Sequence, residues 1–289
     1  MNNHVTLEDL AKRYDTFFID QFGVLLDGVK AYPGSIEALH WLKSRSKEIV
    51  ILSNSGRSGA YNTQRLVAQG FDALSFDHFV TSGDVARHLI TSGALVIPER
   101  AGTRCLTISI ANDSTLSDSL GFIRTDSGHD ADLVVIAGSE ADRVPMERYR
   151  DLLAPAAARK TMCICTNPDI SMLTGKGLAP AAGAIAMLYE EMGGPVRRVG
   201  KPYRDIYDYA LHIIGHKDKA RIVAIGDSIE HDIVGASRFG IAAALVRTGV
   251  LADTPVPQLQ RLSQHLNVDL PQILPNFVRE IESGCVDNS

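Results

Sequence analysis

Residues 16–24 read TFFIDQFGV, an apolar run that ends in an acid, Asp20, and is followed by a turn residue, Gly23. An apolar run of this length beside turn residues predicts a buried strand, and an acid at its end is poorly explained as part of a core. Taken alone, Asp20 has an ordinary alternative role as a cap of a turn or a helix. The prediction of the fold therefore depends on whether apolar strands that end in polar residues recur along the chain.

Further apolar runs of strand length alternate with stretches of helical period. Strands are predicted at 48–52, 221–225 and 242–246, and helices at 35–42, 61–68 and, in the tail, 270–281. A middle part repeats the alternation, with strand-like runs at 103–109, 132–137 and 162–166 and helices at 146–158 and 181–192. This pattern predicts an α/β protein with a doubly wound parallel sheet, covered by helices on both faces, and a second, smaller α/β unit.

Composition narrows the class of protein. The 289 residues suggest about two domains, and 45% apolar with 22% charged residues is typical of globular proteins. A net charge of −5 argues against a protein that binds nucleic acid through phosphate contacts. No apolar run reaches the roughly 20 residues of a membrane-spanning helix, and no signal peptide is visible. We expect a cytoplasmic protein, with Cys163 and Cys165 as small buried side chains.

Polar residues gather at four places that follow a strand or adjoin one, namely 20–23, 53–57, 200–202 and 226–233. In an open parallel sheet, ligands bind beyond the carboxyl ends of the strands, so these places can meet at one edge. The second place offers small hydroxyl and amide groups that suit an anion, although it also reads as an ordinary loop and helix cap. The third holds a lysine in a turn, which solvation alone would explain.

The fourth place gives the most specific signal. Residues 226–233 read GDSIEHDI, and the three acids Asp227, Glu230 and Asp232 repel one another unless a cation lies among them. Mg²⁺ takes carboxylate oxygens together with water and phosphate, which predicts a Mg²⁺ site here. His231 lies inside this stretch and is as readily a capping residue as a catalytic one.

The order of the four places closely resembles the haloacid dehalogenase superfamily: a strand-end Asp, a strand-end Ser, a Lys, and a Gly-Asp with a second Asp five residues on. The long insertion between the second and third places resembles the C2-capped class IIA branch of NagD-like, phosphoglycolate and pyridoxal phosphate phosphatases. The segments CTNPD at 165–169, PAAGA at 180–184 and VGKP at 199–202 fit this branch. The resemblance implies a Rossmann-like core at 1–83 and 180–289 with an inserted cap at 84–179.

The resemblance also implies roles for single residues. Asp20 would be the nucleophile that forms an aspartyl-phosphate. Ser53 would hydrogen-bond the transferring phosphoryl group, and Lys201 would neutralise the nucleophile and the phosphate. Further contacts with phosphate or substrate are expected from Asn54, Arg57, Asn167 and Asp169. A capped turn remains an equal alternative for the last two.

The same resemblance implies a Mg²⁺ cofactor. Asp20, Asp227 and the backbone carbonyl of Phe22 would be metal ligands, and Asp232 would support that site or Lys201. The partner would be a small phosphorylated metabolite, such as a sugar phosphate or a nucleotide-like phosphate monoester. A homodimer is expected by resemblance alone, and no nucleic-acid or membrane partner is expected.

Phe22 departs from the phosphatases of the family, in which an Asp two residues after the nucleophile protonates the leaving group and then activates water. Loss of such a group costs about 10²–10⁴-fold in rate. The prediction is a Mg²⁺-dependent hydrolase of weakened activity, in which another acid such as His231 or Glu230 acts, or whose substrates have good leaving groups. Two alternatives stay open: a protein that binds a phosphorylated metabolite without catalysis, and a dehalogenase-like enzyme, whose first motif also has an aromatic residue here.

Overall fold

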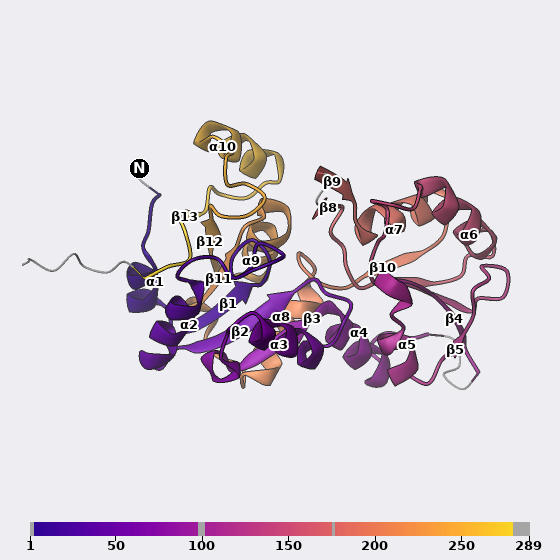
Figure 1. The fold of residues 1–289 in the computed structure, drawn as a ribbon, viewed down its shortest axis with the longest axis horizontal. Helices are drawn as coiled ribbons and strands as arrows, with labels where there is room; N and C mark the ends of the chain where they lie inside the picture. The colour runs from indigo at the N-terminus through magenta and orange to yellow at the C-terminus, as the bar shows by residue number, and fades with distance from the viewer. Residues whose placement is uncertain (1–2, 98–101, 175–176, 280–289) are drawn as a thin grey trace, which may run out of the picture. The chain divides into compact units, whose positions relative to one another are not determined.

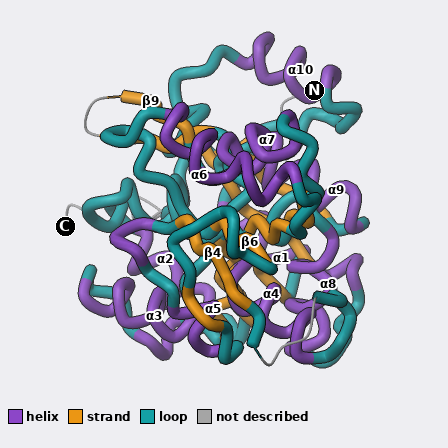
Figure 2. Tube along the Cα trace, turned by 90° about the vertical axis from the view of Figure 1, so that its right-hand side faces the viewer, coloured by secondary structure: helices purple, strands orange, loops and turns teal. Residues whose placement is uncertain are grey.

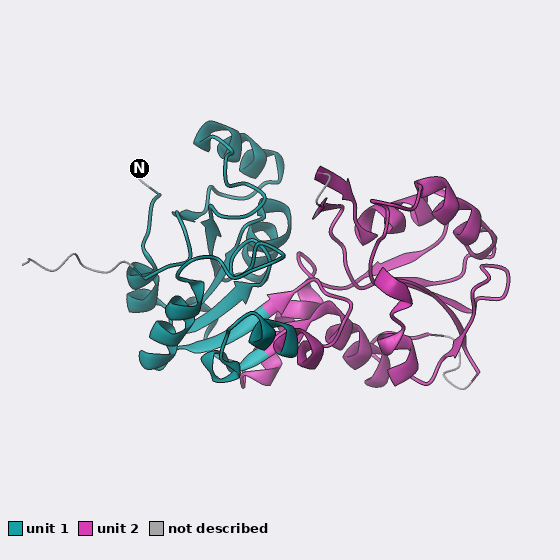
Figure 3. Cartoon of the chain, viewed as in Figure 1, with its two compact units in different colours: residues 1–51, 64–78, 216–289 teal, residues 52–63, 79–215 magenta. Residues whose placement is uncertain are grey.

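A computed structural model describes residues 3–97, 102–174 and 177–279. Packing divides the chain into two compact units (Figure 3). Unit 1 consists of residues 1–51, 64–78 and 216–289, and unit 2 of residues 52–63 and 79–215. The chain thus crosses between the units repeatedly, and each unit collects segments that are distant in sequence.

Unit 1 is organised around parallel strands (Figure 1). β1 (Thr16–Asp20) pairs with β11 (Ile222–Gly226), β11 with β12 (Ala242–Val246), and β12 with β13 (Gln272–Leu274). The sheet order is β13-β12-β11-β1-β2-β3, with β2 at Glu48–Ser53 and β3 at His78–Thr81. The strand order runs outward from β1 to β3 and then, on the other side, from β11 to β13. This is a doubly wound sheet, whose switch point lies between β1 and β11.

Helices flank these strands (Figure 1). They are α1 (Leu7–Arg13), α2 (Ser35–Ser44), α3 (Gly59–Ala68), α9 (Val234–Phe239) and α10 (Val256–His265). All five residues of β11 and the first four of β1 are buried. Strands buried on both faces carry continuous apolar runs rather than an alternating pattern, which is why the sequence marked them clearly.

Unit 2 carries a second sheet, with the order β10-β7-β6-β4-β5. Its strands are all parallel: β4 (Arg104–Ile108), β5 (Ile123–Arg124), β6 (Leu133–Ile136), β7 (Cys163–Cys165) and β10 (Val196–Arg198). A separate antiparallel pair joins β8 (Ser171–Thr174) to β9 (Gly177–Pro180). The helices are α4 (Ser82–Thr91), α5 (Thr115–Ser119), α6 (Met146–Ala158), α7 (Ala182–Glu191) and α8 (Arg204–Ile213).

The core of unit 2 lies between this sheet and two helices. α6 and α7 pack side by side (Figure 2) and share a cluster of buried residues with the strands. Val134 and Ile136 of β6, Leu153 of α6 and Ile185 of α7 belong to that cluster. Cys105, Cys163 and Cys165 are buried free thiols, as the sequence predicted for the last two.

The predicted fold class is confirmed, and the predicted strands of the first sheet lie where the apolar runs placed them. The prediction of a helix over 270–281 is wrong, because residues 272–274 form β13 and complete the edge of the sheet. Pro271 and Pro275 bound this short strand, and a proline at 275 disfavours a continuing helix. Residues 280 and 281 lie outside the described residues. The tail has its helix earlier, at α10.

The predicted domain limits, with a cap ending at residue 179, stay a prediction. The sheet of unit 2 continues past that residue to β10. Among the described residues, no helix is long and apolar enough to cross a membrane.

Candidate active site

Three carboxylates converge at the switch point of the first sheet. Asp20 ends β1, and Asp227 directly follows β11, whose Ile225 is the parallel partner of Ile19. Asp20, Asp227 and Asp232 each offer one carboxylate oxygen, and these oxygens lie within 4.8 Å of one another. Asp227 and Asp232 are buried and Asp20 is half-buried. The structure therefore brings together Asp20 and Asp227, which the resemblance gave as metal ligands, and Asp232, which it gave as a supporting residue. Glu230, the third acid of the stretch at 226–233, is not part of this group.

In this carboxylate trio (Asp20, Asp227 and Asp232), the backbone approaches the Asp227 carboxylate closely. A Cβ atom at Gly23, where φ is +85°, would lie 2.1 Å from Asp227 Oδ2, and one at Gly249 would lie 1.8 Å from it. The amide of Val250 donates to the same oxygen at 2.7 Å. Only glycine leaves room for the Asp227 carboxylate at these two positions. The glycine that follows Phe22 in the sequence is thus part of the site.

Asp232 is held in a similar manner. The amide of Ser228 donates to Asp232 Oδ2 at 3.1 Å, and a Cβ at Gly226 would lie 2.0 Å from Asp232 Cγ. Ser228 also caps the π-helical turn Ile229–Ile233, because its hydroxyl accepts the amide of His231 at 3.3 Å. The ring nitrogen Nδ1 of His231 lies 3.1 Å from the same hydroxyl, so the local contact of His231 is with this cap.

The donor set of the trio fits a hard divalent cation. Carboxylates with oxygens this close repel one another unless protons or a cation offset their charge. Mg²⁺ and Ca²⁺ both prefer carboxylate oxygens, and the trio offers one from each of three residues. The trio could therefore hold a metal ion, while the expected contribution of the Phe22 carbonyl stays a prediction.

The pKa of Tyr32 is affected by the negative charge of this region. Its hydroxyl donates to the carbonyl of Thr248 at 2.7 Å, and the Thr248 hydroxyl donates to the carbonyl of Gly23 at 2.6 Å. Burial, followed by the charges of Asp227 and Asp27, raises the pKa of Tyr32. The phenol therefore stays neutral and acts as a hydrogen-bond donor that ties the Gly23 loop to residue 248.

Phe22 stands two residues after Asp20 and is 39% exposed. The guanidinium carbon of Arg65 lies 6.0 Å from the centre of that ring. The sequence reasoning did not single out Arg65, because one arginine on a polar helix face carries no pattern. Phe22 itself has no group that could move a proton.

A second group of predicted residues gathers in unit 2 around Asn54. The Asn54 Oδ1 accepts the amide of Lys201 at 2.7 Å, and its Nδ2 donates to the carbonyl of Lys201 at 3.0 Å. The same Nδ2 donates to Asp169 Oδ1 at 2.8 Å. Ser53, Asn54 and Lys201 are all buried. The Asn54 carboxamide thus joins the loop after β2, the turn after β10 and the segment after β7.

Two further residues support this group. The Ser82 hydroxyl, at the start of α4, lies 3.4 Å from both the Ser53 carbonyl and Asn54 Oδ1. Gly200 adopts φ +123°, and a Cβ there would lie 2.4 Å from the Ser82 hydroxyl. The turn before Lys201 therefore packs tightly against the end of β2.

Asn167 and Arg57 have partners within unit 2. Asn167 Oδ1 accepts the amide of Asp169 at 3.2 Å, which is the capped turn considered as an alternative. The Arg57 guanidinium pairs with Asp113 at 2.5 Å and contacts the Tyr61 hydroxyl. Burial raises the pKa of Asp113, but hydrogen bonds from Thr115 and Arg57 outweigh it and lower the pKa overall. A phosphate contact by Arg57 stays a prediction.

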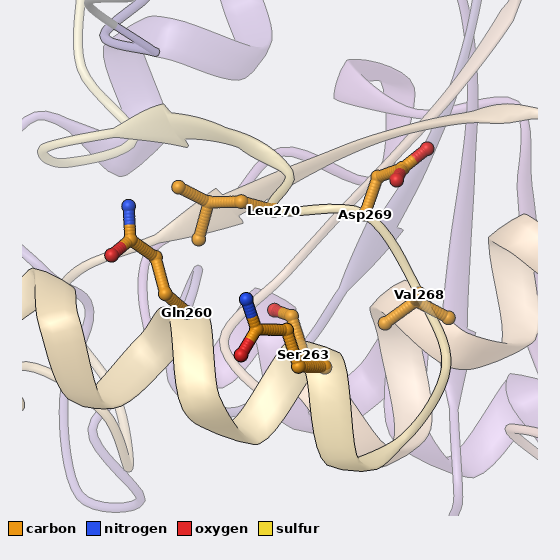
Figure 4. Close-up of a pocket in the computed structure, with 6 residues that line it drawn as sticks. Gln260, Ser263, Val268, Asp269 and Leu270 are labelled. Atoms are coloured by element: carbon orange, nitrogen blue, oxygen red, sulfur yellow. The ribbon is translucent and has the colours of Figure 1, made fainter.

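A pocket of about 320 Å³ lies elsewhere in unit 1 (Figure 4). It is lined by α10 and the segment that follows, through Gln260, Ser263, Gln264, Val268, Asp269 and Leu270. No residue of the carboxylate trio lines this pocket.

Comparison with known proteins agrees with the fold. A family model described as haloacid dehalogenase-like hydrolase matches residues 17–122, and one described as HAD-hydrolase-like matches residues 198–271. The crystal structure of a hydrolase of the haloacid dehalogenase-like family from Brucella suis 1330 is 30% identical, with a TM-score of 0.79. The alignment covers 94% of this chain and 99% of that one.

Two curated relatives are similar over most of their length. The dihydroxyacetone phosphatase of Corynebacterium glutamicum is 25% identical, over 83% of this chain and 84% of its own. The acid sugar phosphatase of Staphylococcus epidermidis is 27% identical, over 83% of this chain and 88% of its own.

The doubly wound α/β sheet, with carboxylates at the strand ends of its switch point, is a Rossmann-like core with a candidate metal site. The chain belongs to the haloacid dehalogenase-like hydrolase family. The family predicted from the sequence is thereby confirmed, and the class IIA branch stays a prediction.

Proposed function

We propose that this chain is a Mg²⁺-dependent phosphatase that acts on small phosphorylated metabolites, such as sugar phosphates or nucleotide-like monoesters. The observation that carries the proposal is the carboxylate trio, whose oxygens lie within 4.8 Å of one another. Its donor set suits a hard cation, which phosphoryl transfer uses to offset charge. Two relatives support the substrate class: one is named dihydroxyacetone phosphatase and the other acid sugar phosphatase.

The proposed reaction runs through Asp20. A carboxylate oxygen of Asp20 attacks phosphorus, a new oxygen–phosphorus bond forms, and the bond to the leaving oxygen breaks. Water then hydrolyses the aspartyl-phosphate and releases phosphate. A divalent cation held by Asp20 and Asp227, with Asp232 in support, would supply neutralisation of phosphoryl charge.

Residues of the Asn54 group complete the proposal. Ser53 would donate a hydrogen bond to a phosphoryl oxygen, and Lys201 would offset negative charge on the nucleophile and the phosphate. Asn54 would act through Lys201, because its carboxamide bonds both backbone polar groups of that residue. Asp169 accepts a hydrogen bond from Asn54 and would orient it, while Asn167 and Arg57 remain candidate contacts to the rest of the substrate.

Phe22 sets a condition on the substrate. Because Phe22 cannot protonate the leaving oxygen, cleavage would depend steeply on how readily that oxygen leaves unprotonated. Aryl phosphates such as p-nitrophenyl phosphate would react faster than alkyl phosphates, unless another acid such as Glu230 or His231 replaces the missing group.

The remaining expectations belong to the same proposal. They are a core at 1–83 and 180–289 with a cap at 84–179, a homodimer, and a location in the cytoplasm. Light scattering on the purified chain would measure the mass of the assembly and so test the dimer.

The deciding experiment is hydrolysis of a panel of phosphate monoesters, including p-nitrophenyl phosphate, with Mg²⁺ and with EDTA. Asp20→Asn removes the nucleophile, and Asp15→Asn is a matched control because Asp15 is exposed and ion-paired with Arg221. Turnover that requires Mg²⁺, disappears in Asp20→Asn and persists in Asp15→Asn is expected.

Other outcomes contradict the proposal. Absence of turnover on every ester, with binding of phosphate esters retained, would indicate a binding protein. The dehalogenase-like alternative is based on the aromatic side chain of Phe22. Release of halide from 2-haloacids that is insensitive to EDTA would favour it.

A further inference from the structure

Phe22 follows Asp20 of the carboxylate trio by two positions and carries a large apolar side chain that is partly open to solvent. Phe22 is 39% exposed, whereas Phe17 and Phe18 of the preceding strand are buried. The backbone around it is fixed, since the amide of Gly23 donates to the carbonyl of Leu26 at 2.8 Å and Gly23 abuts Asp227. The backbone next to Phe22 is therefore held close to Asp227.

Arg65 lies over this ring. It is an exposed residue of α3, and its guanidinium carbon is 6.0 Å from the centre of the Phe22 ring. A cation at this distance from an aromatic face is attracted by the ring, which restrains the position of the guanidinium. The contact places a positive charge beside Phe22, which follows Asp20 by two positions.

The guanidinium of Arg65 is available to a ligand. Within the described part of the chain, no carboxylate forms an ion pair with Arg65, whose guanidinium lies over the Phe22 ring. The guanidinium of Arg57, by contrast, is paired with Asp113, and that of Arg221 with Asp15. An arginine carries five N–H donors in a planar fork that matches a carboxylate or a phosphate group.

We propose that Phe22 and Arg65 together recognise an anionic substituent on the leaving group of the substrate. The proposal rests on the proposed function and narrows its substrate class to phosphate monoesters that carry a carboxylate or a second phosphate. The ring packs against the carbon skeleton of the leaving group, and the guanidinium bonds its anionic end. Phe22, which cannot serve as an acid, thereby has a role in substrate selection.

The test compares two esters of the same length. In 3-phosphoglycerate a carboxylate replaces the terminal hydroxymethyl group of glycerol 3-phosphate. For the wild-type enzyme with Mg²⁺, we expect kcat/KM for 3-phosphoglycerate to exceed that for glycerol 3-phosphate by about tenfold, because a charge-assisted bidentate contact is gained. In Arg65→Gln the ratio of the two values should fall to near one, and Arg65→Lys should retain part of it.

Arg45 provides a matched control. It is also exposed, and its guanidinium carbon lies 5.7 Å from the centre of the Trp41 ring at the end of α2. Arg45→Gln therefore removes a similar cation–ring contact without touching the Phe22 pair, and the ratio should stay as in the wild type. A ratio that falls equally in both variants would overturn the proposal.

The outcomes separate this inference from the proposed function. Equal kcat/KM values for the two esters in the wild type would overturn the inference and leave the phosphatase proposal standing. If neither ester is hydrolysed, the phosphatase proposal fails for both, and calorimetric titration with the same two esters decides the inference. Tighter binding of 3-phosphoglycerate that is lost in Arg65→Gln would then support it, and equal binding would overturn it.

Discussion

The carboxamide of Asn54 bonds both backbone polar groups of Lys201, with Oδ1 2.7 Å from the amide nitrogen and Nδ2 3.0 Å from the carbonyl oxygen. Both residues are buried, and 147 positions separate them in sequence. The Asn54 side chain thus satisfies the amide and the carbonyl of Lys201, as a neighbouring strand would in a sheet. The arrangement fixes where the lysine side chain begins, whatever its ammonium group contacts.

Asn54→Ala should destabilise the fold. The variant leaves a buried N–H and a buried C=O of Lys201 without their partner, and each such loss costs about 1–3 kcal/mol. We expect the unfolding free energy, measured by urea denaturation, to fall by about 2 kcal/mol or more. Ser82→Ala is the control, because the Ser82 hydroxyl reaches Asn54 Oδ1 only at 3.4 Å. Equal stability of Asn54→Ala and the wild type would contradict this role.

The sequence predicted the acids of the site because their strands are short and buried on both faces. Such strands read as continuous apolar runs, and Asp20 ends one of them while Asp227 directly follows another. The clamp by Asn54 was not predictable, since its partners lie 147 and 115 positions away and no local pattern records such a contact. The three-residue strand β13 carries no periodicity, so the tail was read as a helix.

Phe22→Asp should raise phosphatase activity. An acid at this position could protonate the leaving oxygen and then activate water, and general acid–base catalysis contributes about 10²–10⁴-fold. The rate of hydrolysis of an alkyl phosphate should therefore increase by about 10²-fold, with a new ionisation in the pH–rate profile. Phe22→Asn has the same size as the Asp variant and no proton to transfer. Equal rates in the two variants would show that the position does not limit proton transfer.

Gly23→Ala should impair metal binding. The added methyl group would lie 2.1 Å from Asp227 Oδ2, so the carboxylate must move out of the trio. We expect the rise in Tm on addition of MgCl₂ to be lost. Gly28→Ala is a matched control, because Gly28 also has a positive φ of +103° but no atom within 4 Å of the added carbon. If the rise in Tm on addition of MgCl₂ were lost in both variants, backbone strain alone would explain the loss in Gly23→Ala.

Stability should decline in alkaline solution through the buried thiols. Burial raises the pKa of Cys165 to about 12 and that of Cys163 well above its usual value. Because the folded state holds these protons more tightly, their contribution is complete below the unfolded pKa of about 8.5 and is lost as pH rises toward about 12. The urea midpoint should therefore fall as the pH rises from about 8.5 toward about 12.

Cys165→Ala supplies the comparison for this pH dependence. Removing one buried thiol should make the alkaline decline shallower, while Cys163 and Tyr189, whose pKa burial also raises, account for the remainder. An alkaline decline of unchanged steepness in Cys165→Ala would show that other groups control it.

The strand β10 has a consequence for how this chain could be recombined with its relatives. β10 (Val196–Arg198) pairs with β7 at the edge of the second sheet, and Lys201 follows β10 three residues later. A graft that exchanged residues 84–179 alone would give β10 a foreign neighbour and disturb the register that leads to the lysine. The second sheet and Lys201 should therefore be exchanged together. In a chimera, the junction between the two parental sequences should lie after Lys201 rather than before it.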